Sequence, residues 1–444
     1  MNYANRIINS VKQKYPEQTE FVQSVEEVLG SLAEFLERNP IYEEHKILER
    51  LVVPERVIKF RVAWLDDKNV PQVNTGYRVQ FNSAIGPYKG GLRFHPTVNE
   101  SIMKFLAFEQ IFKNSLTGLP LGGAKGGADF DPKGRSSGEI MRFVQAFVTE
   151  LYKYVGDDID IPAGDIGVGD REIGYIFGQY KRLTNRFNGT FTGKNYNFGG
   201  SLIRPEATGY GVLYFVQSLI DTKNDSLEGK NILISGSGNV AQFAAEKAIA
   251  LGAKVITMSD SDGVIFDQHG IDNEKLKYIM DLKNNKRGRI REYVTKFDAE
   301  YFDSKTPWHI PADIAIPCAT QNEIDVLDAL KLIENGVKYV IEGSNMSTTN
   351  EAIKKLRAAG IEYVPGKASN AGGVAVSGLE MAQNGSRLQW TKEEVDNKLR
   401  DIMKTIFNKC VENGQEGGVI NFVKGSNIAG FKKVADAMIS QGVV

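Results

Sequence analysis

The spacing of apolar residues divides the chain into two halves of different character. In the first half, apolar side chains recur at helical spacing over residues 21–37. Strict alternation over residues 58–64 and 73–81 then predicts two half-buried strands that pair antiparallel. Helical spacing returns over residues 100–115 and 138–155. The first 200 residues therefore mix strands with helices.

The second half alternates short apolar strands with helical stretches. A helix is predicted over residues 240–251, and the last helices over residues 391–412 and 428–440. This alternation is typical of a parallel, doubly wound sheet. The pattern changes near the pair Gly199–Gly200, which places a domain boundary near residue 200. The predicted strands lie at residues 231–235, 254–260, 312–320, 337–346 and 361–366.

Composition narrows the class of protein. A chain of 444 residues is long enough for two domains, and 42% hydrophobic with 25% charged residues is the balance of a globular protein. The net charge of −1 gives no basic field for nucleic acid, and no apolar run approaches the roughly 18 residues of a membrane span. Two cysteines, Cys318 and Cys410, make no disulfide framework and fit a reducing, cytoplasmic compartment. Four scattered histidines without an HExxH motif predict no metal site.

A dinucleotide fingerprint follows the first strand of the second half. Residues 236–241 read GSGNVA, in which Gly236 permits a tight turn and Gly238 lets the backbone meet a pyrophosphate. Asn239 and Val240 then begin a helix whose N-terminus faces the phosphates. The next strand ends about 20 residues on at an acidic residue, Asp260, as the fingerprint requires.

The choice between NAD and NADP stays open at this strand end. Asp260 would hold a ribose 2′-hydroxyl and repel a 2′-phosphate. The hydroxyl of Ser261, however, could donate to a phosphate. A basic segment downstream, with Lys283, Lys286, Arg287 and Arg289, forms a 2′-phosphate pocket if it folds back over Ser261, and is otherwise a solvated helix end.

A lysine between two glycine pairs is the main candidate for chemistry. Lys125 stands in LGGAKGGA, which is no P-loop because Gly126 follows the lysine where Ser or Thr is needed. The segment is then either a flexible turn or a site where a ligand approaches the backbone closely. Lys89 also precedes a glycine pair, and Asp165 lies in another glycine-rich loop. Each lysine alone is more typical of a surface, but several cations beside glycines suit a small dicarboxylate.

Seven motifs give the chain a specific likeness over essentially its whole length. With them it resembles the hexameric glutamate dehydrogenases with small subunits, within the Glu/Leu/Phe/Val dehydrogenase superfamily. The motifs are GPYKGGLRF (86–94), FEQIFKNSLTGLPLGGAKGG (108–127), PAGDIGVG (162–169), RPEATGYG (204–211), GSGNVA (236–241), EGSNM (342–346) and SNAGGVAVSG (369–378).

The resemblance implies an α/β fold of two domains. Residues 1–199 would form an N-terminal substrate-binding and oligomerisation domain with a mixed sheet, to which a C-terminal helix at about 425–444 returns. Residues 200–424 would form a Rossmann-type dinucleotide-binding domain with a parallel-type doubly wound sheet.

The resemblance also implies a role for each matching residue. Lys125 would be the catalytic lysine, and Asp165 its partner in proton transfer. Lys89 and Ser377 would hold the side-chain carboxylate of glutamate. Gln110 and Lys113 would hold the α-carboxylate with a backbone contact from Gly164. The cofactor-binding set would be Thr208, Gly236, Gly238, Asn239, Val240, Asp260, Ser261, Lys283, Asn345 and Asn370.

The implied reaction is the reversible oxidative deamination of L-glutamate to 2-oxoglutarate and ammonium. NADP is the expected cofactor, since the family's SDS sequence followed by a basic segment goes with NADP preference, and NAD is the alternative. A homohexamer is expected. The main rival is another amino-acid dehydrogenase of the superfamily, against which a buried Lys89 would argue because it would face an apolar substrate unpaired. A lysine Schiff-base enzyme and a non-catalytic NADP-binding protein are more distant rivals.

Overall fold

The computed structural model describes residues 1–444 as two compact units. Unit 1 consists of Met1–Leu202, Val374–Val395 and Ser426–Val444, and unit 2 of Ile203–Gly373 and Asp396–Gly425. The division falls close to residue 200, and the last helix belongs to unit 1. Val374–Val395 departs from the predicted division, since it was assigned to the dinucleotide domain and lies in unit 1. Contacts between residues far apart in sequence decide this, and periodicity does not report them.

The sheet of unit 1 has five strands in the order β1-β2-β4-β3-β5. The predicted pair β1 and β2 is antiparallel, with Ile58 opposite Arg78. β4 runs antiparallel to β2 and parallel to β3, so the sheet is mixed. The strands are β1 (Arg56–Leu65), β2 (Pro71–Asn82), β3 (Tyr88–Phe94), β4 (Gly123–Ala128) and β5 (Asp160–Gly164).

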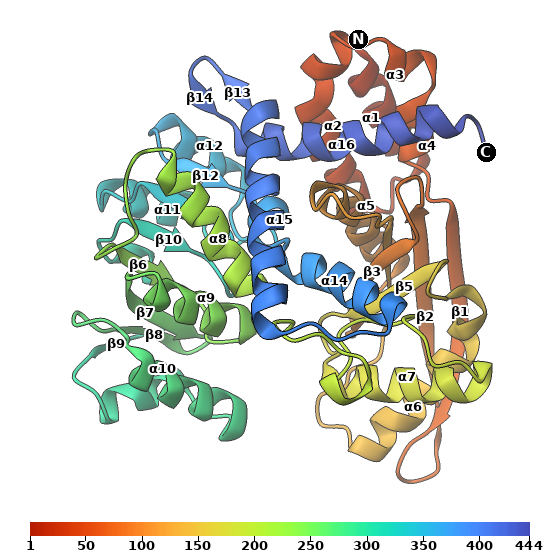
Figure 1. The fold of residues 1–444 in the computed structure, drawn as a ribbon, viewed down its shortest axis with the longest axis horizontal. Helices are drawn as coiled ribbons and strands as arrows, with labels where there is room; N and C mark the ends of the chain where they lie inside the picture. The colour runs from red at the N-terminus through yellow and green to blue at the C-terminus, as the bar shows by residue number, and fades with distance from the viewer. The chain divides into compact units, whose positions relative to one another are not determined.

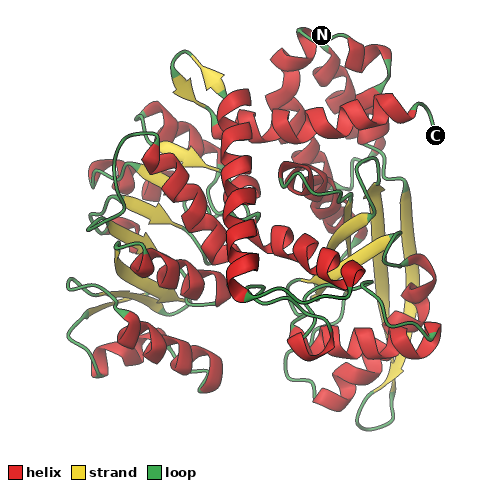
Figure 2. Cartoon of the chain, viewed as in Figure 1, coloured by secondary structure: helices red, strands yellow, loops and turns green.

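Helices flank this sheet, and Figure 2 shows them in red beside the yellow strands. Asn99 caps α5 through its side chain, and Ser136 forms a capping box at α6. α14, which begins at Gly372, was not predicted. The helices are α1 (Tyr3–Lys14), α2 (Thr19–Glu37), α3 (Ile41–Glu44), α4 (Ile47–Leu51), α5 (Glu100–Leu116), α6 (Ser137–Leu151), α7 (Asp170–Thr184), α14 (Gly372–Ser386) and α16 (Phe422–Gln441).

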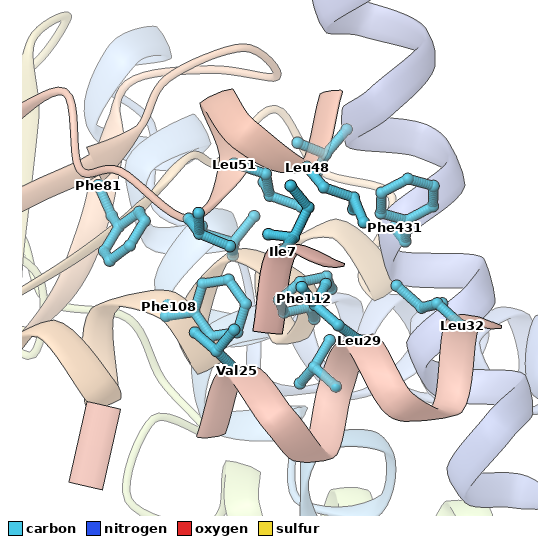
Figure 3. Close-up of a cluster of buried hydrophobic side chains, with 14 of the residues drawn as sticks. Ile7, Val25, Leu29, Leu32, Leu48, Leu51, Phe81, Phe108, Phe112 and Phe431 are labelled. Carbon is cyan, nitrogen blue, oxygen red and sulfur yellow. The ribbon is translucent and has the colours of Figure 1, made fainter. Parts of the chain in front are cut away.

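An apolar cluster fixes α5, the helix that carries Gln110 and Lys113. Figure 3 shows Phe108 and Phe112 of α5 packed among side chains from α1, α2, α4, β2 and α16. Phe431 of α16 lies in this cluster and is fully buried. Burying a phenylalanine side chain contributes about 1.5–3 kcal/mol, so the cluster holds α5 and the returning α16 together.

The sheet of unit 2 has seven strands in the order β12-β11-β10-β6-β7-β8-β9, and Figure 1 labels each of them except β11. The run from β12 to β7 is parallel, as the alternating pattern predicts. β8 and β9 are antiparallel additions at one edge, so the sheet is mixed. The strands are β6 (Asn231–Ile234), β7 (Lys254–Asp260), β8 (Gly263–Phe266), β9 (Glu300–Asp303), β10 (Ile314–Ile316), β11 (Tyr339–Ile341) and β12 (Glu362–Val364).

The strand order of unit 2 reverses between β6 and β10, where open α/β sheets bind their ligands. One face of the sheet packs α11 and α12, with Leu233, Val340 and Leu356 buried between them. A two-stranded hairpin joins β13 (Gln415–Glu416) to β14 (Val419–Ile420). The helices are α8 (Ala207–Asp221), α9 (Asn239–Ala250), α10 (Asn273–Met280), α11 (Val326–Glu334), α12 (Asn350–Ala358), α13 (Gly366–Ser369) and α15 (Lys392–Asn413). No helix of the chain is both long and apolar enough to cross a bilayer.

Candidate functional site

A buried lysine, an aspartate and an arginine meet at the centre of unit 1. Lys125 lies on β4, and its Nζ is 3.2 Å from Oδ1 of Asp165. Arg93 of β3 donates from Nε to the other oxygen of Asp165 at 2.8 Å. Sequence reasoning paired Lys125 with Asp165 but missed Arg93. The available signal was that Arg93 and Lys89 lie on the same face of one strand.

The surroundings shift the pKa of both members of the Lys125–Asp165 pair. Burial is the largest influence on Lys125 and lowers its pKa; Asp165 opposes this, while Arg93 and Arg78 add to it. For Asp165, burial acts to raise the pKa, but Lys125 and Arg93 together lower it to about 2. Asp165 is therefore an anion at every ordinary pH, and Lys125 loses its proton more easily than a solvated lysine.

The glycines around Lys125 have another role than the one expected. A Cβ on Gly122 or Gly127 would come within 2.5 Å of a backbone oxygen of a neighbouring segment, and one on Gly123 would come 2.5 Å from Ile111 of α5. Protein fills these places, so the glycines do not admit a ligand to the backbone. They let β4 pack against its neighbours and against α5. Residues 123–128 of LGGAKGGA accordingly form a buried strand and not a loop.

Gly91 of β3 is the glycine that faces the lysine. A Cβ there would stand 2.8 Å from Cβ of Asp165 and 3.3 Å from Nζ of Lys125. A side chain would push the two groups apart. Gly91, from the pair after Lys89, therefore leaves beside Lys125 the room that the glycines on both sides of Lys125 were expected to leave.

Lys89 lies almost fully buried on β3, with 1% of its surface exposed. Its Nζ donates to the carbonyl of Ile161 at 3.0 Å and to Oγ1 of Thr192 at 2.7 Å. These two acceptors fix the position of the Lys89 Nζ. Thr192 was missed in the sequence, where a lone threonine outside any motif gives no signal.

Gln110 and Lys113 are both half-buried and share α5, as their spacing predicted. Gln110 donates to the side chain of Asn114 at 2.7 Å. Asn114 in turn donates to the carbonyls of Lys89 and Gly122, which flank the two glycine-rich strands. The side-chain amide of Asn114 thus links α5 to the backbone of β3 and to the residue that precedes β4.

Ser377 reaches unit 1 on α14 and is buried. A fully buried ion pair fixes that helix, since Nζ of Lys194 lies 2.7 Å from Oε1 of Glu380. Glu380 also accepts from the backbone N–H of Gly193 at 2.9 Å, next to Thr192. The helix carrying Ser377 and the segment carrying Thr192 are therefore fastened to each other.

In unit 2, the fingerprint opens α9 as predicted. Gly236 has φ +80°, a conformation that favours glycine, and its N–H donates to Oγ of Ser259 at 2.7 Å. Gly238 is the N-cap of α9, which has no side-chain cap and no acid in its first turn. A Cβ on Gly238 would meet no atom within 4 Å. Free N–H groups facing open space suit a pyrophosphate; Asn239 and Val240 lie in that first turn.

The basic segment does fold back over the end of β7. Lys283, in a π-helical turn (Asp281–Asn285), lies 2.9 Å from Oδ2 of Asp260. Arg289 donates from Nη1 to Oγ of Ser261 at 2.8 Å. Asp260 also accepts from the backbone N–H of Ile290 at 2.8 Å. Protein donors thus occupy its carboxylate, whereas Ser261 is exposed beside a guanidinium.

An amide pair missed in the sequence holds the basic segment in place. Gln242 of α9 and Asn284 of the π-helical turn exchange hydrogen bonds at 3.1 and 3.0 Å. Gln242 also donates to the carbonyl of Ser237 within the fingerprint at 2.8 Å. The turn that binds a pyrophosphate in this fold and the turn that carries Lys283 are thereby linked.

The other predicted cofactor residues gather elsewhere in unit 2. Nδ2 of Asn370 donates to Oδ1 of Asn345 at 2.9 Å and to the carbonyl of Gly343 at 3.2 Å. Thr208 lies in the first turn of α8, and a Cβ on Gly373 would stand 2.7 Å from its Oγ1. No group of three or more His, Cys, Asp or Glu side chains is arranged to hold a metal ion.

Comparison with known proteins places the whole chain. A family model described as glutamate/leucine/phenylalanine/valine dehydrogenase matches residues 199–442, and the dimerisation-domain model of the same family matches residues 54–182. An NAD(P)-specific glutamate dehydrogenase of Xylanibacter ruminicola is 59% identical over 99% of each chain. An NADP-specific glutamate dehydrogenase of Escherichia coli (strain K12) is 57% identical over 98% of each chain. A crystal structure of Plasmodium falciparum glutamate dehydrogenase has a TM-score of 0.97 and 51% identity, covering 99% of this chain and 95% of that one.

The fold and the two candidate sites place the protein among the two-domain α/β oxidoreductases that bind a dinucleotide. Within that class, the chain belongs to the glutamate/leucine/phenylalanine/valine dehydrogenase family.

Proposed function

We propose that this protein is a glutamate dehydrogenase that interconverts L-glutamate and 2-oxoglutarate with ammonium, using NADP. The observation that carries the substrate assignment is the buried ammonium of Lys89, which the carbonyl of Ile161 and Oγ1 of Thr192 hold in place. Glutamate offers this ammonium a carboxylate on its side chain, and a charge-assisted hydrogen bond to it is stronger than a neutral one. An apolar side chain offers it no acceptor. The high identity to glutamate dehydrogenases points the same way.

Lys125 and Asp165 are the proposed catalytic residues. Reductive amination requires water to leave, and a proton to move, at the carbon that becomes Cα. With its lowered pKa, Lys125 can take a proton from water and return it to the carbonyl oxygen. Asp165 remains an anion, so it can stabilise a cationic iminium and pass a proton to or from the amine. Lys89, Ser377, Gln110, Lys113 and the backbone of Gly164 are proposed to hold the two carboxylates.

The proposed cofactor is NADP, which supplies or accepts the hydride when bound. Gly236, Gly238, Asn239 and Val240 would hold its pyrophosphate at α9. Ser261, Lys283 and Arg289 would face the 2′-phosphate, since two cations converge on the end of β7. Thr208, Asn345 and Asn370 are proposed for its nicotinamide end. NAD remains a weaker alternative, because the carboxylate of Asp260 already accepts three protein hydrogen bonds.

The assembly and the compartment are proposed by likeness to the family. A homohexamer is expected, and one matched family model is described as a dimerisation domain. Both cysteines are buried and free, which fits a reducing compartment such as the cytoplasm.

The test measures steady-state oxidation of NADPH and of NADH, each with 2-oxoglutarate and ammonium. Turnover in the reverse direction is measured with L-leucine and with L-glutamate. We expect kcat/KM to favour NADPH at least about tenfold, which is about 1.4 kcal/mol of discrimination. Lys125→Ala should lower kcat by about 10² to 10⁴, whereas the exposed Lys68→Ala should keep it. Faster turnover of leucine than of glutamate, or wild-type kcat in Lys125→Ala, would contradict the proposal.

A further inference from the structure

Two cations share the single carboxylate of Asp165. Oδ1 is 3.2 Å from Nζ of Lys125, and Oδ2 accepts from Nε of Arg93 at 2.8 Å. Arg93 and Asp165 are both mostly buried, with side-chain exposures of 17% and 21%. Charge-assisted hydrogen bonds in such surroundings are stronger than neutral ones and fix the geometry of the acceptor.

The strands bring Arg93 to this place by register. β3 pairs with β5 in parallel, with Leu92 beside Gly164, so the next residues along the two segments are Arg93 and Asp165. Because side chains alternate along a strand, Gly91 and Arg93 lie on the same side of the sheet. Gly91 has no side chain where one would strike Asp165 and Lys125. The three charges meet in the room that it leaves.

We propose that Arg93 is a positioning residue for the reaction proposed above, on which this inference rests: it orients the Asp165 carboxylate and takes part of its charge, so that Asp165 does not hold Lys125 permanently as an ammonium. Without Arg93, Lys125 would be the one cation within ion-pair distance of the carboxylate. A buried lysine facing a lone carboxylate keeps its proton, and a protonated lysine cannot act as a base.

The charged groups around Lys125 come from three elements. They are Arg78 on β2, Arg93 on β3 and Asp165 in the turn after β5. Arg78 cannot replace Arg93, because its Nε and Nη2 both bind Asp160, and neither side chain of that pair is exposed. Arg93 is therefore the cation that offsets Asp165.

A purely structural role for Arg93 explains less. The backbone already closes the turn that carries Asp165, since Val168 N–H donates to its carbonyl at 2.9 Å. Phe94 N–H donates to the carbonyl of Ile166 at 2.9 Å and fastens the turn to β3. The ion pair is not needed to form this turn, so its effect falls on the carboxylate.

The experiment compares pH profiles of kcat/KM for the full-length wild type, Arg93→Gln and Arg93→Lys. Activity rises with pH as Lys125 loses its proton. Removing the positive charge of Arg93 favours the protonated lysine, so the acid limb should move to higher pH by about one unit. Below that limb, kcat/KM should fall about tenfold, and Arg93→Lys should recover part of the shift. The matched control, Arg142→Gln, breaks an exposed ion pair with Asp67 and should leave the profile where it is.

A second readout needs no turnover. The pH midpoint of Lys125 acylation by an activated ester, followed by peptide mass spectrometry, should rise in Arg93→Gln by the same amount. If wild-type enzyme turns over no substrate, the proposed function fails, while this midpoint still decides the effect of Arg93 on Lys125. If Arg93→Gln does not fold, Arg93→Gln with Asp165→Asn removes the lone carboxylate and should show a higher midpoint than Asp165→Asn alone. The proposal would be overturned if the acylation midpoint and the acid limb of each Arg93→Gln variant coincided with those of the protein that differs from it only by having Arg93.

Discussion

At the scale of single residues, surroundings decide what each charged group can do. Lys125, Lys89 and Lys113 have the same side chain but different neighbours. Lys125 faces one anion and two cations, whereas Lys89 donates to the carbonyl of Ile161 and to Oγ1 of Thr192. One lysine is thus suited to exchange a proton and another to bind a carboxylate.

Asp165→Asn should change activity and pH dependence in a particular direction. The variant removes the anion that favours protonated Lys125, so the pKa of Lys125 falls further and the acid limb of kcat/KM moves to lower pH. The turnover should drop by about 10² to 10⁴ because the proton partner is lost. A pH series of initial rates, with Lys125 acylation beside it, measures both effects. A limb that moves to higher pH, as in Arg93→Gln, would contradict this account.

At the scale of elements, glycine-rich strands carry the site of unit 1. β3 and β4 pack so closely that a Cβ on Gly90 would stand 1.7 Å from the carbonyl oxygen of Ala124. Beneath them, Arg78 of β2 and Asp160 of β5 form an ion pair with no exposed side-chain surface. Arg78 also donates to the carbonyl of Gly90 at 3.1 Å. This pair therefore joins β2 to β5 across the two strands between them, and Arg78 ties β3 to it.

Arg78→Met should destabilise the protein by about 3–5 kcal/mol, because it leaves the carboxylate of Asp160 buried and uncompensated. The midpoint of denaturant-induced unfolding, read by circular dichroism, measures the loss. The double variant Arg78→Met with Asp160→Leu should recover much of it, since no lone charge remains. A double variant as unstable as the sum of the two single changes would show that the charges are not the cause.

The π-helical turn and its continuation to Arg289 should set cofactor preference. Arg289→Gln removes a guanidinium beside Ser261, and a lost charge-assisted hydrogen bond costs about 1.5–3 kcal/mol, or about ten- to a hundredfold in affinity. We expect KM for NADPH to rise by that factor and KM for NADH to stay. Lys286→Gln is the matched control, because Lys286 pairs with Asp281 in the same segment. An equal rise in KM for both cofactors would show that Arg289 supports the fold and does not select NADPH.

At the scale of the whole molecule, each unit carries one candidate site. The substrate residues Lys89, Lys125 and Ser377 all belong to unit 1, although Ser377 comes from a separate segment that begins at Val374, far beyond the end of the first stretch at Leu202. The fingerprint and the basic segment belong to unit 2. The cofactor and the substrate should therefore protect different segments of the chain when they bind.

Hydrogen exchange read by mass spectrometry should show which segments each ligand protects. NADPH should slow exchange in peptides around residues 236–242 and 258–290. 2-Oxoglutarate should slow exchange around β3, β4 and residues 374–386. The β13–β14 hairpin, which carries no predicted site residue, serves as the internal control. Protection by 2-oxoglutarate confined to unit 2 would contradict the assignment of the substrate residues.

The sequence by itself determined the features that depend on neighbours along the chain. Amphipathic spacing predicted α2, α5 and α6, and the caps Asn99 and Ser136 bind residues only three positions further along the chain. The strand, turn and helix around GSGNVA are equally local, so the dinucleotide fold could be predicted with its first strand and first helix. Long motifs identified the candidate site residues, because their likeness to a family does not require any contact to be known.

Only the tertiary structure decided what depends on register and on distant partners. The glycines of LGGAKGGA belong to a strand because β2, β3 and α5 close around them, and no local pattern reports that closure. Arg93 meets Asp165 through the register of β3 on β5, and Glu380 carries Ser377 into unit 1 through a buried bond to Lys194. The basic segment reaches Ser261 because contacts with Gln242 and with Asp260, both distant in sequence, hold it over the end of β7. Burial and long-range pairing create these environments, and a sequence specifies them only once it is folded.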